Sequence, residues 1–131
     1  MNPIDKIDKK QKILLVDDDE LLREAVGAAL KWAGMDVETL EFPGADFIEK
    51  AEKAHPDLIL LDLYIRDISG LDLCRNLKKN QKTSHIPVVI FTSSTEAIDK
   101  IAGEDAGAVD YVIKPIDINV LLSKIRAHLK K

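Results

Sequence analysis

Short, uninterrupted apolar runs alternate along this chain with segments whose apolar residues recur at helical spacing, and this alternation restricts the possible folds more than any other feature. The runs that we predict to be strands are residues 13–16, 58–61, 88–91 and 111–113, and residues 35–40 are predicted to be a further, half-exposed strand. The segments that we predict to be helices are residues 22–33, 45–54, a stretch after Gly70, 94–106 and 118–129. The first, third and fourth strands lack polar alternation, which indicates a parallel sheet covered by helices on both faces. The predicted fold class is α/β, with five βα units.

Capping residues mark the ends of several predicted helices. Gly34 stands where the first helix should end, because glycine readily adopts the left-handed conformation of a C-cap. Ser93 and Glu96 have capping-box spacing at the start of the fourth helix. Asp117 precedes the last helix, where we expect it to accept backbone hydrogen bonds.

The composition is that of one folded domain. The chain has 131 residues, of which 46% are hydrophobic and 32% charged, and this suits a single core. We divide it into a polar N-terminal extension (1–11) and a domain (12–131). No run approaches the roughly 20 apolar residues of a membrane helix, no signal peptide is evident, and the one cysteine fits a reducing compartment, so we expect a cytoplasmic protein. The net charge of −4 argues against nucleic-acid binding by this domain.

Polar side chains follow the strands that we expect at the centre of the sheet. Asp17 and Asp18 follow the first strand, Asp62 the third, Thr92 the fourth and Lys114 the fifth. Right-handed crossovers bring the carboxyl ends of parallel strands to one edge, where ligands of such folds bind. We therefore expect three carboxylates, a hydroxyl and an ammonium group to converge.

Each of these residues also has an ordinary structural explanation. An aspartate after a strand can cap a helix or start a turn, threonine is a common strand residue, and lysine is usually solvated. For Asp19 and Glu20 we favour such an explanation, namely compensation of the first helix dipole. For the other five residues, their convergence at one edge favours a functional site.

The chemistry of the expected cluster follows from its charges. Three close carboxylates repel one another, so either one is protonated or a cation lies among them. Oxygen ligands without histidine or cysteine suit Mg²⁺, which completes its coordination with water and phosphate oxygens. A lysine and a hydroxyl opposite would hold other phosphoryl oxygens, and a carboxylate can become an acyl phosphate. The cluster therefore suits metal-assisted phosphoryl transfer onto an aspartate.

Four stretches of the sequence point to a known family. They are ILLVDDDE (13–20), PDLILLDLYIRDISG (56–70), IPVVIFTSS (86–94) and GAVDYVIKPID (107–117). Together they resemble the receiver domain of two-component response regulators, over nearly the whole chain from Lys12 to Leu129. The resemblance implies the flavodoxin-like doubly wound sheet, with five parallel strands in the order 2-1-3-4-5.

The resemblance also implies how the phosphoryl group is received. Asp62 would be the phosphoacceptor, with a phosphohistidine or a small phosphodonor as the source. Asp17 and Asp18 would hold Mg²⁺ together with Asp62, and the backbone carbonyl of Tyr64 would be a further ligand. The implied partner is a sensor histidine kinase or a phosphotransfer protein, and the domain would assist its own phosphorylation and dephosphorylation.

Other implied roles concern the response to phosphorylation. Lys114 would bind the phosphoryl group, and the Lys114–Pro115 bond would be cis. Thr92 would be the switch hydroxyl that moves toward the phosphoryl group, and Tyr111 the switch aromatic that turns inward behind it. The signal would be read on the face formed by the fourth helix, the fifth strand and the fifth helix.

A homodimer on activation is one expectation for that face. Acidic residues of the fourth predicted helix and basic residues of the fifth could pair across a two-fold axis. The alternatives are that these charges are solvated, that they pair within one chain, or that a different partner docks there.

The sequence departs from the family pattern near the phosphoacceptor. Ile65-Arg66 stands where Met-Pro is common, and Ser69 where aspartate often precedes the glycine. Tyr64 is bulky for its position. These departures leave the reactive residues in place and put the stiffness of the loop in question.

Two other functions with similar residues fit less well. A phosphatase of the haloacid-dehalogenase kind also uses Asp, Thr, Lys and Mg²⁺, but it needs a second acid two residues after the nucleophile, where this chain has Tyr64. A flavodoxin-like cofactor binder would need a phosphate-binding loop after the first strand, and residues 17–20 are all acidic there.

The remaining residues of potential chemical interest have structural explanations. His55, His85 and His128 lack metal-ligand spacing, and we expect them at the surface. Cys74 and Trp32 are expected to pack in the interior.

Overall fold

One parallel sheet of five strands organises the molecule. The structure, a computed structural model, describes residues 10–93 and 97–129. In the sheet the strand order is β2-β1-β3-β6-β7, which in chain order is 2-1-3-4-5 and confirms the predicted fold class. The strands are β1 (Lys12–Val16), β2 (Asp36–Leu40), β3 (Leu58–Asp62), β6 (Val88–Thr92) and β7 (Asp110–Ile113).

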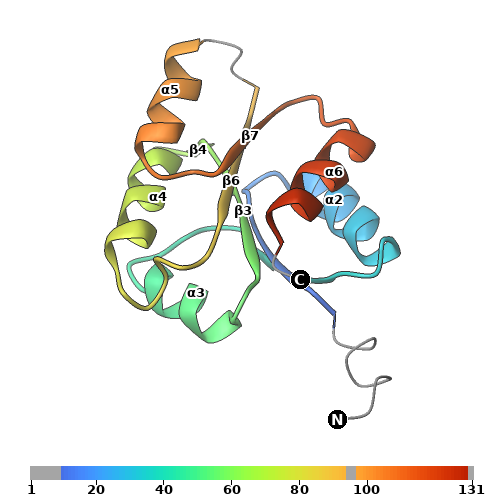
Figure 1. The fold of residues 1–131 in the computed structure, drawn as a ribbon, viewed down its shortest axis with the longest axis horizontal. Coiled ribbons are helices and arrows are strands. Elements are labelled where there is room, and N and C mark those ends of the chain that lie inside the picture. The colour runs from blue at the N-terminus through green and yellow to red at the C-terminus, as the bar shows by residue number, and fades with distance from the viewer. Residues whose placement is uncertain (1–9, 94–96, 130–131) are drawn as a thin grey trace.

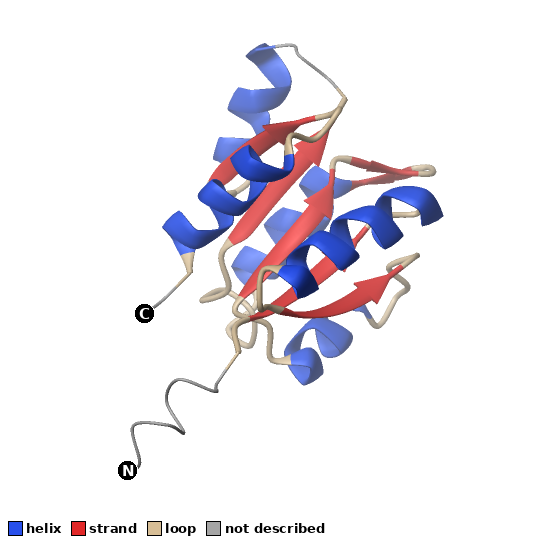
Figure 2. Ribbon diagram, turned by 90° about the vertical axis from the view of Figure 1, so that its right-hand side faces the viewer, coloured by secondary structure: helices blue, strands red, loops and turns tan. Residues whose placement is uncertain are grey.

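Helices cover both faces of this sheet (Figures 1 and 2). One face carries α2 (Glu20–Trp32) and α6 (Ile118–His128). The other carries α3 (Phe47–Ala54), α4 (Gly70–Lys79) and α5 (Ala97–Asp105). The capping box predicted before α5 depends on Glu96, which lies outside the described residues.

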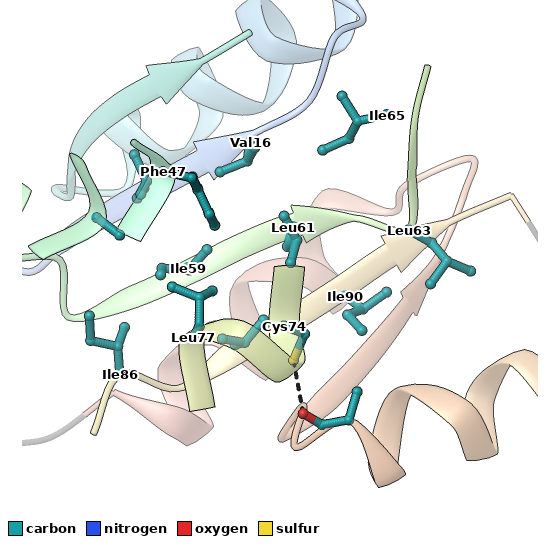
Figure 3. Packing of buried hydrophobic residues seen from close by; sticks show 14 of the residues in the cluster. Val16, Phe47, Ile59, Leu61, Leu63, Ile65, Cys74, Leu77, Ile86 and Ile90 are labelled. Atoms are coloured by element: carbon teal, nitrogen blue, oxygen red, sulfur yellow. Dashed lines mark hydrogen bonds between the residues drawn. The ribbon is translucent and has the colours of Figure 1, made fainter. Parts of the chain in front are cut away.

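The alternation of side chains along each strand divides the core into two layers. Ile13 and Leu15 of β1 join a cluster with residues of α2 and α6, whereas Leu14 and Val16 join one with residues of α3 and α4 (Figure 3). Because successive side chains of a strand point to opposite faces, a strand buried on both sides must be apolar throughout. Each fully buried aliphatic side chain contributes about 1.5–3 kcal/mol.

Two of the predicted helix ends have the expected geometry. Gly34 follows α2 with a φ of 92°, and its backbone N–H donates to the carbonyl of Lys31. Asp117 caps α6, since its Oδ1 accepts from the backbone N–H groups of Asn119 and Val120 at 2.9 and 3.2 Å.

A small hairpin between β3 and α4 was not predicted. Its strands are β4 (Tyr64–Ile65) and β5 (Ile68–Ser69), which pair antiparallel. Arg66 lies in the connecting turn with a φ of 56°. Residues other than glycine, asparagine and aspartate rarely adopt this backbone conformation.

The expectation for Trp32 is wrong, since its side chain is 91% exposed at the end of α2.

Cys74 is buried as predicted, and its Sγ donates to the carbonyl of Ala106 (Figure 3). His55 and His85 are exposed. His128 is partly buried and contacts Asp110. None of the described helices is long and apolar enough to cross a membrane.

Candidate functional site

Three carboxylates meet at the carboxyl edge of the sheet. Asp17 and Asp18 follow β1, and Asp62 is the last residue of β3. Because β1 and β3 are neighbours in the sheet, carboxylate oxygens of all three lie within 4.8 Å of one another. The structure therefore brings together the three carboxylates that the sequence predicts to converge.

Lys114 extends into this cluster from the end of β7. Its Nζ lies 3.4 Å from Asp17 Oδ2 and 3.4 Å from Asp62 Oδ2. The backbone N–H of Lys114 donates to the carbonyl of Thr92 at 2.7 Å, and its ammonium group lies over the ring of Phe91, 4.9 Å from the centroid. The Lys114–Pro115 peptide bond is cis, the geometry that the resemblance implied.

Local hydrogen bonds hold Asp17, whose side chain is fully buried. Its Oδ1 accepts the backbone N–H of Asp19 at 2.8 Å, which leaves Oδ2 facing Lys114. Arg23, one turn into α2, donates from Nη1 to the backbone carbonyl of Asp17 at 2.8 Å. The sequence did not predict this role for Arg23, because apolar periodicity contains no information on where a long polar side chain ends.

Burial and repulsion act on Asp62. Desolvation, followed by the nearby charge of Asp17, raises the pKa of Asp62 to about 6, against the opposing effects of Lys114 and of the Tyr64 backbone N–H. Because close carboxylates repel one another when ionised, a divalent cation among them would relieve the part of this pKa shift that comes from the charge of Asp17.

Gly70 allows the backbone behind Asp62 to pack closely. A Cβ at position 70 would lie 2.1 Å from the carbonyl oxygen of Asp62 and 2.9 Å from Leu63 Cα. The Gly70 N–H also donates to the carbonyl of Leu63 at 2.7 Å. The start of α4 therefore fixes the end of β3 through direct backbone contact.

The remaining predicted site residues lie around the carboxylates. Thr92 is the last residue of β6 and is buried. The side chain of Tyr64 is 58% exposed, and its backbone N–H donates to Asp62 Oδ1 at 3.4 Å. Tyr111 is only 8% exposed and lies beside Gly103, so its side chain is buried in this structure.

Arg66 is a further residue at the site that sequence reasoning had treated only as a departure from the family pattern. Its Nε lies 3.9 Å from Asp18 Oδ2, and its Nη2 lies 3.8 Å from Glu41 Oε1. Its guanidinium carbon lies 4.9 Å from the centre of the Phe42 ring. The sequence signal was the replacement of a common proline, but the direction of the side chain depends on the left-handed backbone at this position.

The donor set fits a hard cation. Asp17, Asp18 and Asp62 supply carboxylate oxygens, and no histidine or cysteine belongs to the group. Such ligands suit Mg²⁺ better than zinc or copper.

Comparisons with known proteins agree with this geometry. Residues 13–126 match the family described as the response regulator receiver domain. The chain is 42% identical over 120 residues to the response regulator ArlR of Staphylococcus saprophyticus, covering 92% of this chain and 53% of that protein. It therefore spans about half the length of the curated relatives that it matches.

Solved structures show the same similarity. The chemotaxis protein CheY4 of Vibrio cholerae superimposes with a TM-score of 0.84 at 27% identity, covering 92% of this chain and 100% of the other. The BeF₃-activated N-terminal receiver domain of Klebsiella pneumoniae RstA does so with a TM-score of 0.82 at 33% identity, with the same coverage. Since sequence and fold agree over nearly its whole length, the chain belongs to the receiver domains of two-component response regulators.

Proposed function

We propose that this receiver domain accepts a phosphoryl group on Asp62 in a Mg²⁺-dependent reaction. The donor is a phosphohistidine of a sensor kinase or of a phosphotransfer protein, or a small phosphodonor. The observation that carries the proposal is the placement of Lys114 Nζ at 3.4 Å from both Asp17 and Asp62, within a group of three converging carboxylates.

In the proposed transfer, a carboxylate oxygen of Asp62 attacks phosphorus. The phosphorus–nitrogen bond of the donor breaks, and its electron pair returns to the imidazole ring. Lys114 and the hydroxyl of Thr92 bind phosphoryl oxygens and stabilise the charge that they carry. A magnesium ion held by Asp17, Asp18, Asp62 and the carbonyl of Tyr64 would neutralise phosphoryl charge.

The signal ends by hydrolysis of the acyl phosphate. Water attacks phosphorus, the bond between phosphorus and Asp62 breaks, and inorganic phosphate leaves with the carboxylate regenerated. We propose that the same charged groups assist this step, so that the domain limits the lifetime of its own signal.

Phosphorylation is proposed to shift a two-state equilibrium. Thr92 is the residue that contacts the phosphoryl group, and Tyr111, which is buried in this structure, is the aromatic side chain that would pack behind it. The surface of α5, β7 and α6 is proposed to be the readout face, either for a homodimer or for another partner. Lys124 of this face is paired within the chain, with Asp110 at 3.0 Å, so its charge is a weak argument for a dimer.

Mass spectrometry of the intact protein tests the phosphoacceptor. After incubation with acetyl phosphate and magnesium chloride, the wild-type chain should gain one phosphoryl group, and Asp62→Asn should gain none. Asp67→Asn is the matched control, because Asp67 is an exposed aspartate of the same loop. Phosphorylation of Asp62→Asn, or full reaction of the wild type in EDTA, would contradict the proposal.

Magnesium binding is tested separately by following backbone amide NMR signals during a titration. The signals of residues 17, 18 and 62–64 should shift in the wild type. A variant with both Asp17→Asn and Asp18→Asn should lose this response. Equal binding by that variant would place the ion elsewhere.

A further inference from the structure

We propose that Arg66 is an internal counter-ion of Asp18 that lowers the affinity of the acidic site for divalent cations. The inference rests on the proposed magnesium site and adds a residue that regulates it. Arg66 Nε lies 3.9 Å from Asp18 Oδ2, one of the three carboxylates that converge at the end of the sheet.

The two cationic side chains at this site, Lys114 and Arg66, pair with different carboxylates. Lys114 Nζ contacts Asp17 and Asp62, whereas Arg66 contacts Asp18 from the turn between β4 and β5. Every acid of the cluster therefore has a positive group within 4 Å. A metal ion that binds Asp18 has to compete with Arg66 for it, because both are attracted to the same carboxylate.

Contacts outside the cluster hold the guanidinium group in place and give it a second position to occupy. Arg66 Nη2 lies 3.8 Å from Glu41, and the guanidinium lies over the ring of Phe42. Both residues belong to the segment after β2, so one side chain joins the β4–β5 turn to a separate loop. When a cation takes Asp18, Arg66 can remain bound to Glu41 and Phe42 without becoming fully solvated.

The backbone directs the side chain toward these partners. Arg66 has a φ of 56° in the turn between the paired residues Ile65 and Ile68. A proline could not adopt this angle, since its ring holds φ near −65°. Arg66 therefore supplies both the charge that pairs with Asp18 and the left-handed backbone that directs this side chain toward it.

Magnesium titrations followed by amide NMR test the inference, with Arg66→Gln compared to the wild type. Loss of the competing charge should lower the dissociation constant for Mg²⁺ about two- to tenfold, the range expected for one partly screened charge near a divalent ion. Arg75→Gln is the matched control, because Arg75 pairs with Asp72 on α4 and its loss changes the net charge equally. Equal dissociation constants for the two variants would overturn the inference.

Arg66→Gly separates the effect of charge from that of backbone strain. Glycine keeps the left-handed turn, so this variant should bind Mg²⁺ as tightly as Arg66→Gln even if glutamine perturbs the hairpin. Wild-type affinity in both variants would exclude a counter-ion role.

A double-mutant cycle with Glu41→Gln tests the second position of the guanidinium. Without Glu41, Arg66 should stay on Asp18, so Mg²⁺ binding should weaken more in the Arg66 background than in the Arg66→Gln background. Equal weakening in both would rule out the exchange between Asp18 and Glu41. If the wild type shows no Mg²⁺-dependent shifts at all, the magnesium site itself is refuted. If the wild type binds Mg²⁺ and Arg66→Gln binds it with the same dissociation constant, only the counter-ion role of Arg66 is refuted.

Discussion

At Asp62, the burial of a carboxylate beside a second one opposes the stability of the fold. Its pKa is raised to about 6, first by burial and then by the charge of Asp17. The folded state therefore holds more protons than the unfolded state between about pH 4 and pH 6, and stability falls as the pH rises through this range.

The variant Asp62→Asn should remove this dependence. In the absence of divalent cations it should exceed the wild type in free energy of unfolding at pH 8 by up to about 3 kcal/mol. The difference should vanish below about pH 4, where both side chains are neutral. Urea unfolding at several pH values measures it, and Asp67→Asn serves as the control. A constant difference across this pH range would show that Asp62 is ionised as in water.

The turn residue Arg66 gives a prediction about backbone conformation. Replacing Ile65-Arg66 by the Met-Pro pair that is common in the family should destabilise the domain by about 1–3 kcal/mol, because proline cannot adopt the φ of 56° found here. The Ile65→Met single variant should change stability by less than about 1.5 kcal/mol. Unchanged stability of the double variant would mean that the turn reaches another conformation without strain.

At the scale of single elements, the close contact at the start of α4 predicts a large effect of one methyl group. Gly70→Ala would place a Cβ 2.1 Å from the carbonyl oxygen of Asp62. The helix must then move away from β3, and we expect a loss of about 3 kcal/mol or more together with slower phosphorylation of Asp62.

A glycine within α2 provides the control for this substitution. A Cβ at Gly27 would meet only Val37 Cγ1, at 4.0 Å. Alanine is the better helix former by about 1 kcal/mol, so Gly27→Ala should leave stability unchanged or raise it. Thermal unfolding of both variants measures the two changes in stability. Similar losses of stability would show that burial of the glycine, and not the clash with Asp62, causes the destabilisation.

The caps of two helices offer a matched pair of tests. Asp117 accepts two backbone hydrogen bonds at the start of α6, so Asp117→Ala should cost about 1 kcal/mol. Asp46 occupies the corresponding position of α3, but its side chain makes no capping hydrogen bond with the described residues. Asp46→Ala should therefore cost less, and chemical denaturation should show the ranking. An equal cost would assign the effect to the helix dipole.

The success of sequence-based prediction differed between elements for physical reasons. The strands β1, β3 and β6 were predictable because burial on both faces requires continuous apolar runs, and convergence of the residues after them followed from parallel topology. The hairpin β4–β5 has two residues in each strand, which is too short for any periodicity. The contacts of Arg66, Arg23 and His128 depend on the direction that each polar side chain takes, which local sequence patterns do not specify.

Solvent exposure at one position was mispredicted for a different reason. Trp32 was expected to pack near the end of the first helix. Helical spacing places Val26 and Leu30 on the buried face of α2, and Trp32 lies off that face. The helical spacing therefore indicates exposure at position 32, and it is a better guide here than the apolar character of tryptophan.

For the whole molecule, stability should depend on magnesium in a manner set by pH. A ligand that binds only the folded state raises its stability by an amount that grows with the ratio of ligand concentration to dissociation constant. In the proposed site Mg²⁺ binds the ionised form of Asp62, so the increase in melting temperature with magnesium should be larger at pH 8 than at pH 5. Differential scanning calorimetry measures this increase, and Asp62→Asn should show little of it at either pH. An equal increase at both pH values would point to nonspecific ionic effects.

The exposed end of α2 has a consequence for spectroscopy. Trp32 is the chain's one tryptophan, and because water surrounds its indole in the folded domain, its emission should change little when the core unfolds. Tyrosine signals and circular dichroism are better measures of folding here. The same exposure makes Trp32 a native fluorophore for contact at the outer end of α2, since a protein that covers the indole would shift its emission to shorter wavelength without any label.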